Sequence, residues 1–110
     1  HADEKTALET EKAALQDKIA SLRNEISSIP GDTEKKNIQE RIDALNEEKR
    51  SLGLFKGKEK KAVQEKIDAA NLELKTIVDR MDAAKKEIEK KIVPLQQRIA
   101  EIDVELTKAR

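Results

Sequence analysis

Asp and Glu together supply 23 carboxylates in this sequence of 110 residues, and carboxylates can act as catalytic acids and bases. Two groups are close in sequence: Asp43 with Glu47 and Glu48, and Asp79 with Asp82. Such groups divide the roles of acid and base only where burial or close pairing moves their pKa values apart. The helical periodicity described below places both groups on solvated helix faces. We therefore predict that they solvate the surface and that the chain has no catalytic residue.

Other catalytic and metal-binding chemistry lacks its usual side chains. The only histidine is His1, so a Ser or Thr nucleophile elsewhere in the chain has no imidazole base beside it. The sequence contains no cysteine, and no segment matches the calcium-binding loop with its central glycine and terminal glutamate. Asp32 and Glu34 lie close in sequence, but they would hold only a stray cation. We predict no enzymatic activity, no cofactor and no functional metal site.

The most distinctive segment is residues 52–61, which read LGLFKGKEKK and interrupt the helical pattern. The segment holds the only phenylalanine, two of the three glycines and a cluster of lysines. Apolar side chains beside lysines can enter a membrane interface, and the same lysines can contact nucleic-acid phosphates or a protein. Alternatively, the apolar side chains fold back over the end of the hydrophobic seam, and the segment is a turn. The candidate contact residues are Leu54, Phe55, Lys56, Lys58, Lys60 and Lys61.

The composition indicates long helices rather than a compact globular core. Charged residues make up 42% of the sequence and aromatic residues 1%, while the apolar residues recur at steps of three and four. This combination is typical of coiled coils. The 23 acidic and 23 basic residues give no net charge, which removes the general electrostatic reason to bind nucleic acid or an anionic membrane. No apolar stretch approaches the ~20 residues that span a bilayer.

Heptad spacing predicts two helical arms of nearly equal length. In the first arm, residues 3–52, the apolar positions are Leu8, Leu15, Ile19, Leu22, Ile26, Ile29, Ile38, Ile42, Leu45 and Leu52. In the second arm, residues 58–109, they run from Val63 through Ile67, Ala70, Leu74, Ile77, Met81, Ala84 and Ile88 to Leu106 and Ala109. Because such stripes must be covered, we expect the arms to pack on one another.

Three interruptions divide this pattern. Pro30-Gly31 is a strong turn signal, and Asp32 or Thr33 is suited to cap the helix that follows. Residues 53–57 are predicted to be the turn between the arms, with Gly53 or Gly57 at the positive φ that often ends a helix. Pro94 lacks an N–H and should kink the second arm without dividing it into two helices.

Two all-α architectures remain open at this point. If Pro30-Gly31 only kinks the first arm, the chain is a long antiparallel helical hairpin. It is then a coiled coil in which Leu45 faces Ile67, Ile42 faces Ala70 and Ile38 faces Leu74. If Pro30-Gly31 reverses the chain, the result is an elongated three-helix bundle in which residues 82–109 of the third helix protrude. We favour the hairpin because its arms match in length. In either case we predict a single helical domain over residues 1–110.

These features favour a non-enzymatic coiled-coil structural or interaction module that serves as a spacer, arm or oligomerisation element. Alanine-rich layers bury little apolar area, so we expect a protein partner, which can be a second copy bound through the seam from Ile88 to Leu106. The alternative is a binding arm whose basic and apolar tip, residues 54–61, contacts nucleic acid or an anionic membrane. The zero net charge makes this alternative the weaker one.

One part of the sequence resembles known proteins. Residues 52–68, which read LGLFKGKEKKAVQEKID, are similar to a segment found in helical regions of uncharacterised bacterial coiled-coil proteins. The resemblance covers about one-sixth of the chain and implies a bacterial origin and a helical turn at this position. Those proteins carry no agreed activity, so the resemblance assigns no functional residue.

Overall fold

The computed structural model describes residues 2–53 and 56–108, and these form three α-helices: α1 (Ala2–Ser27), α2 (Asp32–Ser51) and α3 (Gly57–Lys108). The fold is therefore all-α, as predicted. The contacts divide the chain into two compact units, and α3 contributes to both. Unit 1 comprises residues 1–29 and 83–110, and unit 2 comprises residues 30–82.

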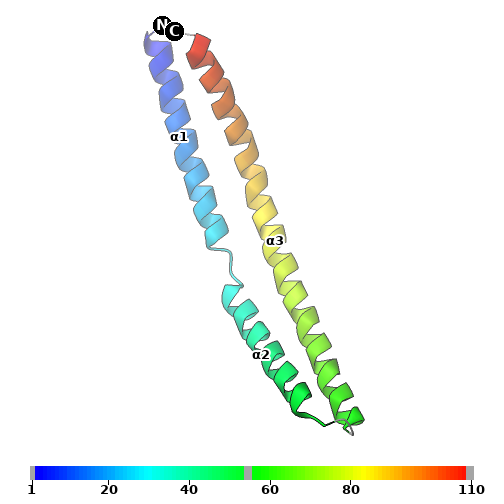
Figure 1. Cartoon of the computed structure of the whole chain (residues 1–110). Coiled ribbons are helices and arrows are strands. Elements are labelled where there is room, and N and C mark those ends of the chain that lie inside the picture. Colours follow the sequence, from blue (N-terminus) through cyan, green and yellow to red (C-terminus); the bar gives the residue numbers. More distant parts are fainter. Residues whose placement is uncertain (1, 54–55, 109–110) are drawn as a thin grey trace. The chain divides into compact units, whose positions relative to one another are not determined.

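In unit 1, α1 packs antiparallel on the C-terminal part of α3 (Figure 1). Ile19 and Leu22 of α1 form a buried cluster with Ile92 of α3. Around this cluster lie partly buried side chains from both helices: Ile26, Ile88, Leu95 and Ile99. The heptad positions of the two arms therefore face each other, as an antiparallel coiled coil requires.

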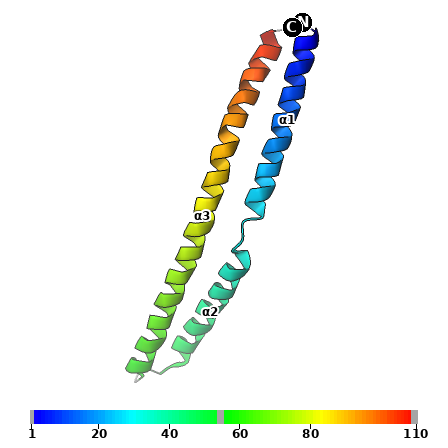
Figure 2. The same cartoon turned by 180° about the vertical axis from the view of Figure 1, so that it is seen from behind.

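In unit 2, α2 packs antiparallel on the N-terminal part of α3, as both views of the ribbon show (Figures 1 and 2). Ile38 and Ile42 of α2 form a buried cluster with Ala70 and Ile77 of α3, and Leu74 packs against it. These residues include two of the three facing pairs that the heptad register predicts, Ile42 with Ala70 and Ile38 with Leu74. The antiparallel helical hairpin is confirmed.

The three-helix bundle is wrong because α1 uses its apolar face on α3. The bundle required residues 19–26 to pack on residues 38–45, whereas Ile19 and Leu22 lie against Ile92. The seam from Ile88 to Leu106, which we expected a partner to cover, is covered within the chain. Ile92 is 5% exposed and Ile102 is 0% exposed, so a partner that bound this seam would have to displace α1.

The break between α1 and α2 depends on the backbone of Gly31 rather than on a polar cap. Gly31 has φ 136° and is the N-cap of α2, and its carbonyl accepts the first helical hydrogen bond from the Lys35 N–H at 2.8 Å. The prediction that Asp32 or Thr33 caps this helix is wrong, since α2 begins at Asp32 and no side chain bonds the cap. Asp32 and Glu34 instead lie in the first turn, where negative charge favours the helix dipole.

The end of α2 also differs from the expectation that a glycine takes a positive φ there. Leu52 is the C-cap with an extended backbone, and its N–H bonds the Lys49 carbonyl at 3.3 Å. Gly31 is the one residue with a positive φ in the described part of the chain, so neither Gly53 nor Gly57 adopts one. α3 then continues through Pro94 as one helix, as we preferred over two.

Candidate interaction surfaces

The predicted tip residues lie at the start of α3, and the structure describes four of the six. Lys56, Lys58 and Lys61 are exposed, and Lys60 is half-buried. Lys56 contacts Glu59 at 3.6 Å, while no carboxylate of the described residues pairs with the other three lysines. Lys60 lines a groove of about 370 Å³ whose other walls are Asn46, Lys49 and Arg50 of α2 and its C-cap Leu52.

Leu54 and Phe55 lie outside the described residues. The question that the sequence poses about them, burial against the seam or contact with a partner, therefore stays a prediction. The described lysines alone form a basic cluster at the first turn of a long helix. Three of their side chains are exposed and carry their positive charge at the surface.

The carboxylate groups singled out in the sequence do not come together in a site. Asp79 pairs with Lys75 at 2.7 Å, Glu47 pairs with Arg50 at 2.6 Å, and Glu34 contacts Arg80 at 3.4 Å. All of these carboxylates are exposed. Within residues 2–53 and 56–108 there is no cluster of three metal-ligating side chains, and no helix long and apolar enough to cross a membrane. The described residues also bury no polar or charged side chain.

A two-point polar contact in unit 1 joins α1 to α3. Arg98 donates from Nε and one terminal nitrogen to the two carboxylate oxygens of Glu11, at 2.8 and 2.9 Å. Glu101 and Glu105 also lie within 3.6 Å of the guanidinium. The hydrogen bonds from Arg98 hold the pKa of Glu11 below its ordinary value, and the bonds that Arg98 donates to Glu11 and Glu101 raise the pKa of Arg98.

Unit 2 has a similar set of contacts between its helices. Arg41 of α2 pairs with Glu73 of α3, and Lys49 of α2 bonds Gln64 of α3 at 2.6 Å. The Arg41–Glu73 pair lies over an open groove of about 450 Å³ whose floor is apolar; its lining is Glu34, Asn37, Ile38, Arg41, Glu73, Thr76 and Ile77. These polar contacts fix the register of the hairpin and close the sides of its apolar seam.

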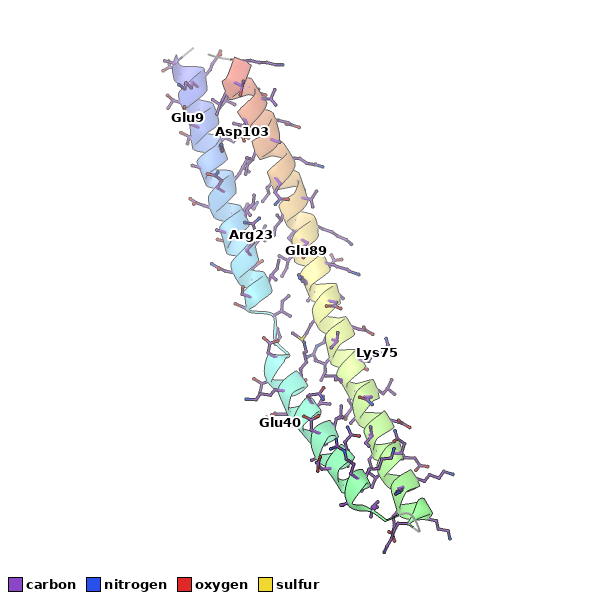
Figure 3. The ribbon with its side chains drawn as sticks, viewed as in Figure 1. Glu9, Arg23, Glu40, Lys75, Glu89 and Asp103 are labelled. Atoms are coloured by element: carbon purple, nitrogen blue, oxygen red, sulfur yellow. The ribbon has the colours of Figure 1, made fainter. Side chains whose placement is uncertain are left out.

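Exposed apolar side chains occur on the outer side of α3, a feature that our sequence reasoning missed. Leu72, Val93 and Val104 are 66%, 49% and 53% exposed, and all three belong to α3. Val93 borders a groove of unit 1 that is rimmed by Arg23 and Glu89, both labelled in Figure 3. The available signal was that these three apolar residues fall outside the main heptad stripe, at positions that the main heptad frame leaves to solvent.

No family model, curated protein or solved structure matches this chain. The comparisons therefore add no functional residue to the resemblance of residues 52–68. The surfaces described above are what the chain offers for function.

Proposed function

We propose that this chain is a non-enzymatic interaction module, a coiled-coil hairpin that presents the outer face of α3 to a protein partner. The proposal rests on one observation: the large apolar side chains left exposed in the described residues are Leu72, Val93 and Val104. All three belong to α3. Apolar groups on the outside of a two-helix coiled coil contribute nothing to its own seam. A partner that packed on this side of α3 would remove these side chains from water, which is favourable in proportion to the apolar area buried.

The seam explains why the hairpin is suited to this role. α1 and α2 cover the inner face of α3, and ion pairs such as Glu11–Arg98 and Arg41–Glu73 hold the helices in register. In each unit, the side of α3 that faces away from its partner helix is thereby left exposed. A spacer or oligomerisation element needs this combination of a fixed inner face and an available outer face.

The test replaces the three exposed apolar residues with glutamine in the cell from which the sequence comes. We expect Leu72→Gln/Val93→Gln/Val104→Gln to keep the melting temperature of the native chain, because surface changes alter stability by about 0.5 kcal/mol or less each. We also expect it to move from a complex to the size of the chain alone in native size-exclusion chromatography. The matched control changes exposed alanines of the other helices, Ala13→Gln, Ala20→Gln and Ala44→Gln. If the two variants eluted at the same size in native size-exclusion chromatography, the proposal would be refuted.

A second candidate function rests on the lysines at the start of α3. Lys58 and Lys61 are exposed without a carboxylate partner in the described residues, which favours contact with phosphates of nucleic acid or an anionic membrane. Binding to either should weaken steeply as salt rises. Replacing Lys56, Lys58, Lys60 and Lys61 with glutamine should abolish the binding. Binding that survives these four changes would rule this function out.

A further inference from the structure

The outer face of α3 in unit 2 carries a second heptad pattern, centred on Leu72. Leu72 is the most exposed large apolar side chain of the described residues, and its neighbours at steps of three and four are also exposed. We call this set the outer stripe, and its members are Ala62, Glu65, Ala69, Leu72, Thr76 and Asp79. The stripe lies wholly within unit 2. Leu72 and Asp79 are on the side of α3 opposite the cluster around Ala70 and Ile77, while Ala69 and Thr76 border the grooves between α2 and α3.

Charges border the outer stripe in strict alternation on both sides. On the flank nearer α2, residues spaced by seven alternate between acid and base: Glu59, Lys66, Glu73 and Arg80. Glu73 and Arg80 already pair with Arg41 and Glu34 of α2, so the far flank carries most of the charge available to a second copy. On the far flank, residues spaced by seven alternate with the opposite phase: Lys61, Asp68, Lys75 and Asp82. All eight are exposed, and Figure 3 shows Lys75 on the side of α3 away from α2. In coiled coils, charges at these bordering positions decide which helices pair and in which orientation.

We infer that the outer stripe binds a second copy of this chain, α3 against α3 in antiparallel orientation, with Leu72 opposite Ala69 of the second copy. This inference rests on the proposed function and names its partner. In this register each flank meets the same flank of the second copy, and opposite charges face each other throughout. The facing pairs are Glu59 with Arg80, Lys66 with Glu73, Lys61 with Asp82, and Asp68 with Lys75, and the two-fold axis repeats each pair.

The same charges oppose the competing arrangements. If the antiparallel register slips by one heptad in the direction that brings Leu72 opposite Thr76, Lys66 faces Arg80 and Asp68 faces Asp82. If it slips the other way, Glu59 faces Glu73 and Lys61 faces Lys75. In a parallel pair, Lys61 faces Lys66, and Asp68 faces Glu73. Every bordering contact is then between like charges, which disfavours these registers and leaves one orientation.

The pairing that results is specific but weak. Its apolar centre consists of the two Leu72 and two Ala69 side chains, and Glu65 and Asp79 interrupt the stripe on either side of that centre. The small residues Ala62, Ala69 and Thr76 permit a close approach of the two helices. With so little apolar area, affinity comes mainly from the short centre, while the bordering charges supply specificity. We expect a dimer that forms at high protein concentration and dissociates on dilution.

Charge exchange at the far flank tests the pairing with purified chains. Asp68→Lys alone places like charges opposite Lys75 twice per dimer, and Lys75→Glu alone does the same opposite Asp68. We expect each variant to self-associate at least roughly tenfold more weakly than the native chain in sedimentation velocity. Mixing the two variants should restore association. In the mixed dimer, the lysine introduced at position 68 of one chain faces the glutamate introduced at position 75 of the other. The unchanged Lys75 of the first chain then faces the unchanged Asp68 of the second. Raised salt should weaken native self-association.

The control for Asp68→Lys is Asp43→Lys on α2. Both aspartates are exposed and accept a hydrogen bond from the glutamine four residues earlier, Gln64 and Gln39, at 2.8 and 3.1 Å. We expect Asp43→Lys to self-associate like the native chain. Leu72→Gln serves as a second probe that leaves every charge in place and should also weaken the dimer. Helical circular dichroism checks that each variant is folded.

A mixture of the two variants that associates no better than either alone would overturn the inference, as would a native chain that stays monomeric at the highest concentrations. These outcomes are separate from failure of the proposed function. A monomeric native chain that still loses its cellular complex when Leu72, Val93 and Val104 are replaced would refute self-pairing and leave the interaction module standing. Restoration on mixing, with Asp43→Lys unaffected, would support the antiparallel register directly.

Discussion

Arg98 of α3 holds the carboxylate of Glu11, 87 residues earlier on α1, by two charge-assisted hydrogen bonds of 2.8 and 2.9 Å. The paired geometry matches the planar guanidinium to both carboxylate oxygens, so it fixes orientation as well as distance. Lys12, the next residue of α1, contacts Asp103 at 2.6 Å. Together the two pairs set the register of α1 on α3 within unit 1.

Replacing the guanidinium by an amine should loosen this register. Arg98→Lys keeps the charge but loses the two-point contact, so we expect a lower melting temperature. Glu11→Gln should lower it as well, and the double variant should lower it by less than the sum of the two, because both remove one interaction. Arg80→Lys is the control, since Arg80 contacts Glu34 at a single longer distance of 3.4 Å. Strict additivity of Arg98→Lys and Glu11→Gln would show that the pair is not coupled.

The Glu11–Arg98 pair also makes stability depend on pH in the acid range. The pKa of Glu11 lies below its ordinary value of 4.5 in the folded chain, because Arg98 stabilises the carboxylate. A lowered folded pKa contributes stability that is present above the unfolded pKa and is lost as the pH falls through the folded pKa. The difference in melting temperature between the native chain and Glu11→Gln should therefore be present at pH 7 and shrink below pH ~4.5. A difference that is constant from pH 7 to pH 3 would contradict this account.

The heptad pattern was sufficient to predict the hairpin. The apolar positions of both arms are those that meet in the structure, as Ile42 with Ala70 and Ile19 with Ile92 illustrate. The sequence leaves the bundle open because Pro30-Gly31 fits both a kink and a reversal. Only the contacts of α1 with α3 decide between them, since those contacts join residues far apart in the chain.

Sequence patterns did not predict the N-cap of α2 at Gly31 or the exposed apolar residues on the outer face of α3. Polar residues normally cap helices, yet the N-cap of α2 is Gly31, whose backbone has a φ that few other residues adopt. The side chain beside it is Met81, which comes from α3. On α3, Leu72 falls outside the main apolar stripe, and a heptad frame fitted to that stripe says nothing about apolar residues outside it. Among the candidate contact residues, Lys60 is half-buried rather than exposed, because α2 packs beside it.

Gly31 should tolerate no side chain. Its φ of 136° is a region that L-residues rarely adopt, and a Cβ there would lie 2.6 Å from the Sδ of Met81 and 3.4 Å from Ile77. We expect Gly31→Ala to destabilise the chain by about 1–3 kcal/mol in urea denaturation. Gly53→Ala is the control, because nothing lies within 4 Å of its Cβ position and its φ is not positive. If Gly31→Ala also proved neutral, the backbone described for this break would be wrong.

Adjacent residues of α3 should differ sharply in their effect on stability. Ile92 is 5% exposed in the cluster with Ile19 and Leu22, whereas Val93 is 49% exposed. Truncation of a buried isoleucine to alanine costs about 2–5 kcal/mol. We therefore expect Ile92→Ala to lower the free energy of unfolding by an amount in that range, and Val93→Ala to change it by about 0.5 kcal/mol or less. A larger loss for Val93→Ala than for Ile92→Ala would mean that Val93, rather than Ile92, faces α1.

The most direct measurement of whether the outer face of α3 is a contact surface is cross-linking inside the source cell. A photoreactive phenylalanine derivative is placed at position 72, and separately at the exposed Glu40 of α2, which Figure 3 labels. We predict a discrete adduct from position 72, at twice the mass of the chain if the partner is a second copy, and none from position 40. An absence of adduct from position 72, or equal adducts from both positions, would contradict the account.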